Sequence, residues 1–281
     1  MKMPSDVGRR FIVPNGASLH LMAGADSVTG YLAAKIYSTS RHGTHFVVLL
    51  YRSETGEPLA QIEADYLGQV RTGAASGIAT RQMALEEATA LAVIGTGKQA
   101  RTQVQAVARV RKLTEVRVFS RDAGRRAAFA EWAAQETGAA TRPTESALQA
   151  IEGADIVVTA TTARDPVVLG EWLQPGVHVN AIGSNMASRR ELDEAAVARA
   201  GLIVTDSVEQ ARHEAGELIA AFRQRPEEWS RVGELCRVVS GEQRGRESPR
   251  QITLFKSNGI ALEDVAVAGF LYEQALAAGL G

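Results

Sequence analysis

The sequence predicts an α/β fold made of a doubly wound parallel sheet and a second, smaller α+β domain. The first observation is the length, since 281 residues at roughly 150 per domain are just under two domains. The second is that short, continuously apolar strands alternate with helical segments after Leu85, which is typical of a parallel sheet covered on both faces. The third is that the stretch from Leu19 to Ile62 has the pattern of strands alone.

Composition and charge exclude several partners and locations. Apolar residues make up 45% and charged residues 22%, as in an ordinary globular chain. The 31 basic and 32 acidic residues give a net charge of −1, so we expect neither a nucleic acid nor a membrane as partner. The single cysteine, Cys236, cannot form an internal disulfide, and this favours the cytoplasm. Residues 1–13 lack the apolar core of a signal peptide, and the longest strongly apolar stretch, 46–51, is far shorter than the roughly 18 residues of a membrane span.

In the first part of the chain, two strands at 46–51 and 58–62 flank a turn-rich loop and predict a hairpin. A helix is expected over 65–85, and its centre is rich in glycine and alanine. Because glycine weakens a helix, these small residues suggest close approach by another backbone or by a ligand. His42 and His45 form a close pair without carboxylate or cysteine support, so we expect no metal site.

In the second part, strands and helices alternate up to the end of the chain, where an alanine-rich amphipathic helix is expected. Continuous apolar strands joined by helices predict a parallel sheet, because parallel neighbours need a crossover connection. The expected strands are 91–94, 116–119, 156–159, 178–181 and 202–205, and the expected helices are 99–110, 123–135, 146–151 and 262–278.

The strongest local signal is a G-x-G-x-x-A motif directly after the strand 91–94 and directly before a helix. The first glycine permits a tight turn, the second lets backbone amides approach a pyrophosphate, and the small alanine lets helix and strand pack closely. The motif predicts a Rossmann-type dinucleotide-binding domain. The alternative is a glycine turn in an α/β domain with no ligand. The candidate cofactor-binding residues of the motif are Gly95, Thr96, Gly97, Lys98, Gln99 and Ala100.

The end of the next strand bears on which dinucleotide is bound. An acid there would hydrogen bond to the ribose 2′-hydroxyl of NAD, but Ser120 stands in its place and Arg121 follows. A guanidinium suits a 2′-phosphate, so we expect NADP(H) to be preferred and NAD(H) to be possible, with Arg125 or Arg126 assisting. The alternative is that Asp122 caps the next helix and Arg121 is only a surface residue.

Lys35 lies within a predicted strand over 32–38, and alternation places it on the face opposite Leu32, Ala34 and Ile36. It is either an exposed charge at an edge or a group that projects into a cleft. Arg10 and Arg71 carry no signal by themselves. Together with Lys35 in one cleft, however, they would suit a small carboxylate substrate.

Several stretches together resemble the ornithine cyclodeaminase/mu-crystallin family over nearly the full length. The resemblance implies homodimers, with a substrate and dimerisation domain at 1–84 and 258–281 and an NAD(P)-binding Rossmann domain at 85–257. It implies small imino or amino acids as substrates, with Arg10, Lys35 and Arg71 holding the substrate carboxylate. The matching stretches are RTGAASGIAT from Arg71, GTGKQAR from Gly95, VRVFSR from Val116, VNAIGSNMASRRELD from Val179 and ITLFKSNGIALED from Ile252.

The chain departs from this family in two places. It begins almost at Arg10, without the N-terminal helical segment usual in the family, which leaves the architecture of the dimer open. Asn185 stands where ornithine cyclodeaminases carry an aspartate. An amide cannot act as a general base, so Asn185 argues against cyclodeamination and for simpler hydride chemistry on an imine. The alternative is that Asn185 only caps a turn.

The sequence and the resemblance together predict an NADPH-dependent reductase of a small ketimine or imino acid that also runs in reverse as an amino-acid dehydrogenase. Lys35, Arg71 and Asn185 are the candidate catalytic residues, and crowding by two arginines should lower the pKa of Lys35. Thr161 and Thr162 are expected to line the nicotinamide side, with Ser257 closing the pocket. The alternatives are an ornithine cyclodeaminase and a non-catalytic NADPH-dependent binding protein.

Overall fold

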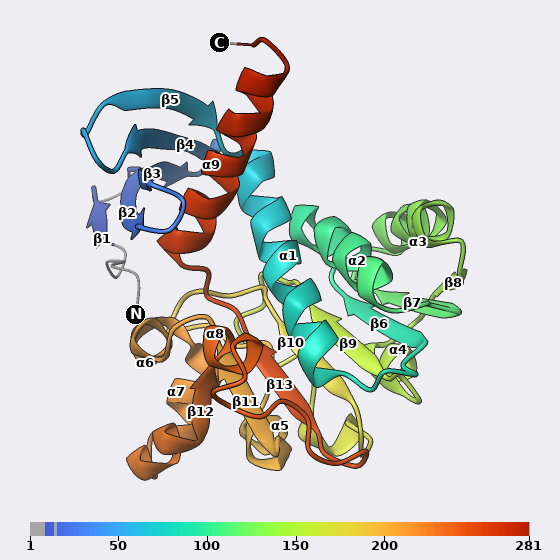
Figure 1. Cartoon of the computed structure of the whole chain (residues 1–281). Helices are drawn as coiled ribbons and strands as arrows, with labels where there is room; N and C mark the ends of the chain where they lie inside the picture. The colour runs from blue at the N-terminus through green and yellow to red at the C-terminus, as the bar shows by residue number, and fades with distance from the viewer. Residues whose placement is uncertain (1–8, 14–15, 281) are drawn as a thin grey trace. The chain divides into compact units, whose positions relative to one another are not determined.

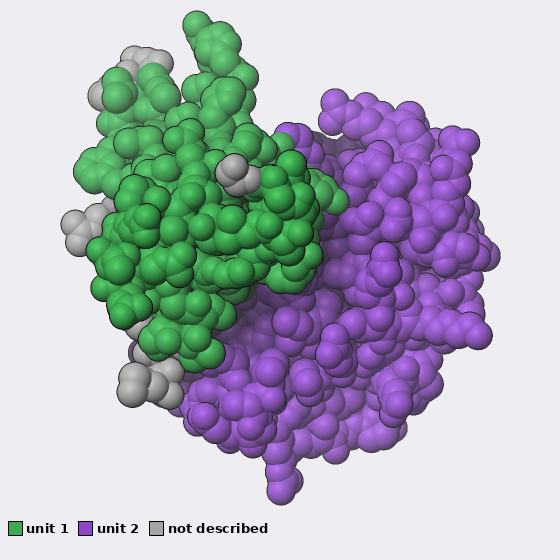
Figure 2. All heavy atoms as spheres, turned by 45° about the horizontal axis from the view of Figure 1, so that its top comes forward, with its two compact units in different colours: residues 1–71, 259–281 green, residues 72–258 purple. Residues whose placement is uncertain are grey.

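The computed structural model describes residues 9–13 and 16–280, and the side chains of Arg9 and Arg10 lie outside the description. The chain divides into two compact units, one made of Met1–Arg71 with Gly259–Gly281 and the other of Thr72–Asn258 (Figure 2). The first division falls inside helix α1 (Asp65–Met83), whereas the sequence places it at 84/85. The second falls at 258/259, against the expected 257/258.

Unit 1 is an antiparallel sheet with helix α9 (Ala261–Ala277) and the first turns of α1 packed on it (Figure 1). The strands follow one another in chain order, and the predicted hairpin is confirmed as β4 and β5. Helix α9 packs against β2, β3 and β4, and Val265 and Ala268 join Tyr31 and Leu50 in the core. The strands are β1 (Arg9–Ile12), β2 (Ser18–Asp26), β3 (Tyr31–Ser40), β4 (Gly43–Arg52) and β5 (Pro58–Glu63).

Unit 2 is a parallel sheet in the order β12-β11-β13-β10-β9-β6-β7-β8, which confirms the predicted fold class (Figure 1). From β6 the chain adds β7 and β8 on one side of the sheet and then β9 and β10 on the other side, as in a doubly wound sheet. The strands are β6 (Ala90–Ile94), β7 (Glu115–Phe119), β8 (Ala140–Pro143), β9 (Ile156–Thr159), β10 (His178–Ala181), β11 (Leu202–Thr205), β12 (Val232–Glu234) and β13 (Thr253–Lys256).

Several helices of unit 2 begin at a residue whose side chain caps the helix. Asp122 accepts a hydrogen bond from the Arg125 amide at 2.9 Å at the start of α3, and Ser146 and Asp193 act in the same way at α4 and α5. The helices are α2 (Lys98–Val110), α3 (Ala123–Thr137), α4 (Ala147–Ile151), α5 (Glu194–Arg199), α6 (Val208–Glu214), α7 (Gly216–Phe222) and α8 (Leu235–Val239), with short 3₁₀ turns η1 (Gly170–Trp172) and η2 (Pro226–Arg231).

The small residues in the centre of α1 receive the backbone of α2. A Cβ built on Gly73 would lie 2.6 Å from the carbonyl oxygen of Thr102, and one on Gly77 would lie 3.3 Å from that of Ala106. The expected close approach is therefore one of helix against helix.

Strand β13 is the main element that the sequence did not predict. It lies between β10 and β11 in the middle of the sheet, and all four of its residues are buried. β1, β8 and β12 were also not expected. In the described part of the chain, no helix has the length and apolar character needed to cross a membrane.

Candidate functional site

A buried cluster of two cations and two carboxylates lies within unit 1. Lys35 Nζ is 3.0 Å from Asp264 Oδ1, and Arg71 Nε lies 3.2 Å from the same oxygen. Arg71 Nη1 is also 2.9 Å from Glu263 Oε2. Lys35, Arg71 and Asp264 are exposed by only 4%, 9% and 1%, so these charges interact in a poorly screened environment.

The surroundings of Lys35 decide between the two interpretations of this residue. β3 is the middle strand of its sheet, and Lys35 shares the buried face with Tyr31 and Ala33, so the exposed edge charge is wrong. Its Nζ lies 5.5 Å from the ring centroid of Phe46 and 5.9 Å from that of Tyr37. Burial and then Arg71 lower the pKa of the Lys35 ammonium, and Asp264 opposes them.

Arg71 is held in place from two sides. It lies in α1, and its guanidinium is fixed by Glu263 and Asp264 in the first turn of α9. Gly259 has φ +74°, and a Cβ built there would overlap the guanidinium of Arg71. Only glycine suits this position, because it tolerates the left-handed conformation and leaves room for the arginine.

Arg10, the third predicted cation, is described only in its backbone. The backbone of Arg10 pairs with His20 in the ladder of β1 and β2, and its side chain lies outside the described part of the structure.

Glu263 and Asp264 were not among the predicted site residues, because acids in the first turn of a helix are expected for the helix dipole alone. Asp264 Oδ2 is buried and has no hydrogen-bond partner in the described residues, which leaves an acceptor open inside the cluster.

The G-x-G-x-x-A loop in unit 2 has the geometry of an anion-binding helix start. Gly95 has φ +108°, and a Cβ there would overlap the carbonyl of Ala160. Gly97 is the N-cap of α2, where no side chain caps the helix and no acid lies in the first turn to repel an anion. Ala100 is fully buried, as close packing of helix and strand requires. The loop thus fits the pyrophosphate of a dinucleotide.

The remaining residues of the motif and of the next strand end differ in exposure. Lys98 and Arg121 are exposed, while Thr96, Gln99 and Ser120 are half-buried. The hydroxyl of Ser120 donates to the Asp122 carbonyl at 3.1 Å. Arg126 is buried, donates to the Ser120 carbonyl at 3.1 Å and pairs with Glu145.

The other predicted positions follow strands of the same sheet. Thr161 is half-buried and Thr162 exposed after β9, and Ser257 is buried after β13, where its amide donates to the Ala181 carbonyl at 3.1 Å. Asn185 is exposed in the loop after β10. None of these four residues belongs to the cluster of Lys35 and Arg71 in unit 1.

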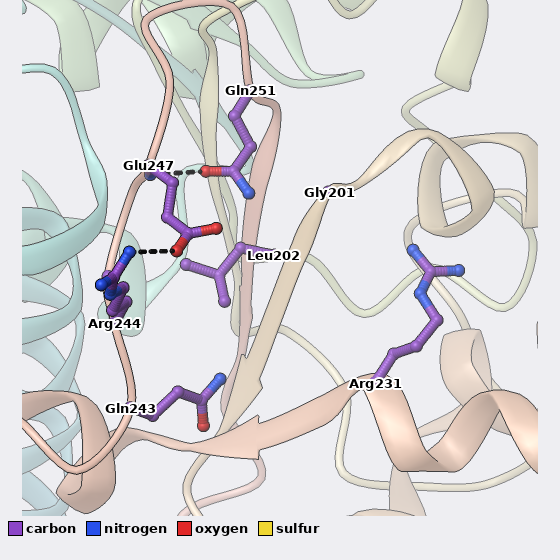
Figure 3. A pocket seen from close by; sticks show the side chains of 8 residues that line it. Gly201, Leu202, Arg231, Gln243, Arg244, Glu247 and Gln251 are labelled. Carbon is purple, nitrogen blue, oxygen red and sulfur yellow. Dashed lines mark hydrogen bonds and ion pairs between the residues drawn. The ribbon is translucent and has the colours of Figure 1, made fainter.

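A hollow of about 420 Å³ lies at the other end of the sheet, around the first residue of β11 (Figure 3). Arg244 and Glu247 point toward each other there, with 3.5 Å between Nη1 and Oε1. Ligands of open parallel sheets bind at the carboxyl ends of the strands, so this hollow is not the cofactor site. Its lining residues are Gly201, Leu202, Arg231, Gln243, Arg244, Gly245, Glu247 and Gln251.

Comparisons with known proteins agree with this architecture. Residues 3–279 match the model of the ornithine cyclodeaminase/mu-crystallin family. The chain is 42% identical over 236 residues to a Δ1-pyrroline-2-carboxylate reductase of Bacillus cereus, covering 84% of this chain and 72% of the relative.

Two solved structures are similar over the whole chain. One is the Thermococcus litoralis Δ1-pyrroline-2-carboxylate reductase in complex with NADH and L-proline, with a TM-score of 0.94, 35% identity and coverage of 100% of this chain and 89% of that one. The other is an archaeal alanine dehydrogenase dimer with bound NAD, with a TM-score of 0.92, 32% identity and coverage of 100% and 88%.

Proposed function

The chain belongs to the ornithine cyclodeaminase/mu-crystallin family, and from this premise we propose that it reduces a small ketimine or imino acid with a nicotinamide cofactor and, in reverse, acts as an amino-acid dehydrogenase. The observation that carries the proposal is the buried pair of cations, Lys35 and Arg71, around one carboxylate oxygen. Such a pair suits an α-carboxylate and supplies a proton donor in the same place. The relatives named as Δ1-pyrroline-2-carboxylate reductases support an imine as the substrate.

Arg71 binds the substrate carboxylate, together with Arg10. Its guanidinium is a rigid fork that already lies between Glu263, Asp264 and Gly259, so little freedom is lost when a carboxylate binds. Lys35 and Arg71 balance Glu263 and Asp264, so a third cation, Arg10, would balance the carboxylate of the substrate and avoid a buried excess of negative charge.

Lys35 donates the proton that the imine nitrogen gains. Reduction adds a hydride to the imine carbon and a proton to the nitrogen, and the C=N double bond becomes a single bond. The reduced nicotinamide supplies the hydride when it is bound. Because burial and Arg71 lower its pKa, the ammonium of Lys35 gives up a proton more readily than an exposed lysine does.

The dinucleotide binds with its pyrophosphate at the start of α2, and we extend the proposal to a preference for NADPH. The nearest acid to the end of β7, Asp122, is used as the cap of α3, while Arg121 is exposed beside it. Arg121→Ala should weaken NADPH binding about ten- to a hundred-fold and leave NADH binding nearly unchanged, since one charge-assisted contact is lost. Equal losses for both cofactors, or tighter binding of NADH by the parent protein, would contradict the preference.

We also propose that the protein forms a homodimer in the cytoplasm. The C-terminal half of α9 exposes Phe270, Leu271 and Leu276, and a second copy would cover apolar side chains of this kind. The similar archaeal alanine dehydrogenase is a dimer. Light scattering coupled to size exclusion should give twice the chain mass, and a monomer would refute this part. The lone cysteine fits a reducing compartment.

The experiment that tests the function measures cofactor consumption. Δ1-pyrroline-2-carboxylate, other cyclic ketimines and 2-oxo acids with ammonia or methylamine are each mixed with NADPH or NADH. At least one should oxidise the cofactor in stoichiometric amounts. Ammonia release from ornithine with catalytic NAD, without net cofactor turnover, would favour the cyclodeaminase. Tight cofactor binding with no turnover on any substrate would favour the binding protein.

A further inference from the structure

Glu191 is a fully buried carboxylate in unit 2 to which the mechanism assigns no role. Oε2 accepts a hydrogen bond from the Thr159 hydroxyl at 2.8 Å and another from the Gly183 amide at 2.7 Å. Oε1 accepts from the Thr161 amide at 2.6 Å. One carboxylate therefore fixes the backbone just beyond the carboxyl ends of two adjacent strands, β9 and β10.

Glu191 itself is fixed by its own backbone. Its amide donates to Glu217 Oε1 at 2.8 Å, and its carbonyl accepts from the amides of Val167 and Val168 at 2.8 and 3.0 Å. The next residue, Leu192, forms a β-bridge with Val168. The carboxylate is thus held to a rigid support and does not depend on a mobile side chain for its position.

The segments that Glu191 holds are stacked against the glycine loop. A Cβ on Gly95 would overlap Ala160 and lie 3.0 Å from the Thr161 methyl group, and a Cβ on Gly183 would overlap the backbone of Thr161. The residues after β9 therefore lie between the first glycine of the G-x-G-x-x-A motif and the loop after β10. A shift of the Thr161 amide moves one wall of the cofactor site.

The chemistry requires Glu191 to be ionised. All three of its partners point donors at it, and two of them are backbone amides that cannot turn round, so a protonated carboxyl would face donors. Burial raises the pKa of Glu191 above its ordinary value, and Lys256 and the hydrogen bonds from Thr159 and Thr161 offset only part of this increase. Lys256 Nζ is fully buried, lies 3.6 Å from Glu217 Oε2 and donates to the Ser184 carbonyl at 2.5 Å.

We propose that Glu191 is a positioning residue for the nicotinamide half of the cofactor. The inference rests on the proposed function, because it assumes a dinucleotide at the G-x-G-x-x-A loop. The hydrogen bonds of the Glu191 carboxylate go to the residues around β9 and β10 and not to the first amides of α2, where the pyrophosphate binds. Its loss should therefore affect the two halves of the cofactor differently.

Glu191→Gln is the sharpest variant, since it keeps the shape and points an amide NH₂ group at backbone N–H donors. NADH and ADP-ribose, and NADPH and 2′-phospho-ADP-ribose, are titrated by calorimetry without substrate. We expect the complete cofactors to bind about ten-fold more weakly or worse and the two nicotinamide-free ligands to change by less than about two-fold, as the loss of charge-assisted hydrogen bonds implies. Glu194→Gln, an exposed carboxylate in the same segment, is the matched control and should change nothing.

A second variant covers the case in which Glu191→Gln does not fold. Thr159→Val removes one donor to Oε2 and leaves the carboxylate in place, so it should produce the same selective loss at about three-fold. Equal loss for complete and nicotinamide-free ligands, or no loss in the folded variant, overturns the positioning role. A parent protein that binds no dinucleotide at all overturns the proposed function as well, whereas selective loss without imine reduction supports Glu191 and refutes only the reaction.

Discussion

Both units bury a lysine against carboxylates, and the surroundings of the two lysines differ in ways that decide their roles. Lys35 shares Asp264 with Arg71 and lies over the rings of Tyr37 and Phe46, so side chains make up its surroundings. Lys256 donates to the carbonyls of Ser184 and Ala181 as well as pairing with Glu217. The first lysine is held among side chains that could also contact an anion, and the second links its own strand to the backbone after β10.

The balance of positive and negative charge also differs between the two clusters. Lys35 and Arg71 balance Glu263 and Asp264, whereas Lys256 alone faces Glu191 and Glu217. A further anion would be strongly opposed in the second cluster and tolerated in the first. A buried lysine is thus a candidate for binding an anionic substrate when the carboxylates around it do not already outnumber the cations.

Arg71→Ala should have the largest effect on catalysis. If it has none, the cluster of Lys35 and Arg71 is not the substrate site and the contrast with Lys256 no longer holds. We expect kcat/KM on the imine to fall about a thousand-fold, roughly 4 kcal/mol, because a buried charge pair with the substrate is lost and Asp264 loses one of its two cations. Cofactor affinity, measured by calorimetry, should stay intact. Arg81→Ala on the exposed side of α1 is the control. Normal turnover by Arg71→Ala would refute the proposal that Arg71 binds the substrate carboxylate.

Lys256→Met should lower stability and leave the other cluster untouched. Removing one partner of a buried pair costs about 3 kcal/mol, and here it also removes the Lys256 donor from the Ser184 carbonyl. Urea unfolding should show this loss in the free energy of unfolding, against almost none for the exposed Lys112→Met. An unchanged unfolding midpoint would mean that Lys256 is not the structural member of the pair.

Lys35 should set the alkaline limb of the pH–rate profile. Its pKa is lowered in the folded protein, so it is protonated and able to donate below that pKa and loses this ability as pH rises through it. We expect kcat/KM for imine reduction to fall with a pKa below the ordinary lysine value of 10.5. Lys35→Met should be slow at every pH and lack this limb. A limb that persists in Lys35→Met would belong to another group.

Asn185→Asp should have the smallest effect, since Asn185 lies on an exposed loop outside both clusters. The new charge should change the rate and the pH profile by less than about ten-fold and leave thermal unfolding unchanged. The parent protein should release no ammonia from ornithine. Robust release would show that another residue supplies the charge a cyclodeaminase needs.

The dinucleotide loop could be predicted because its signal is local. Strand, turn and helix are contiguous around Gly95 and Gly97, and each glycine has a reason that is visible within about six residues. Alternation likewise placed Lys35 on the correct face of its strand. It could not distinguish a buried face from an exposed one, because α9, far along the chain, supplies the cover.

The features that were missed depend on long-range contacts. β13 contains a lysine and pairs with strands far earlier in the sequence, so its buried position in the sheet has no local signal. Glu263 and Glu191 gain their roles only from partners that are well separated from them along the chain. The roles of all the predicted site residues, including Arg10, Ser120, Thr162 and Ser257, remain predictions.

The position of β13 also has a consequence for the order in which the protein can fold during synthesis. Among the strands that the structure describes, β11 and β12 join the rest of their sheet through β13 alone, so they are made on the ribosome before the strand that connects them. The sheet of unit 1 likewise waits for α9 to cover its apolar face. The last stretch of chain, 253–277, completes both units at once, and a nascent chain that stops before it leaves each unit with an uncovered surface that favours aggregation.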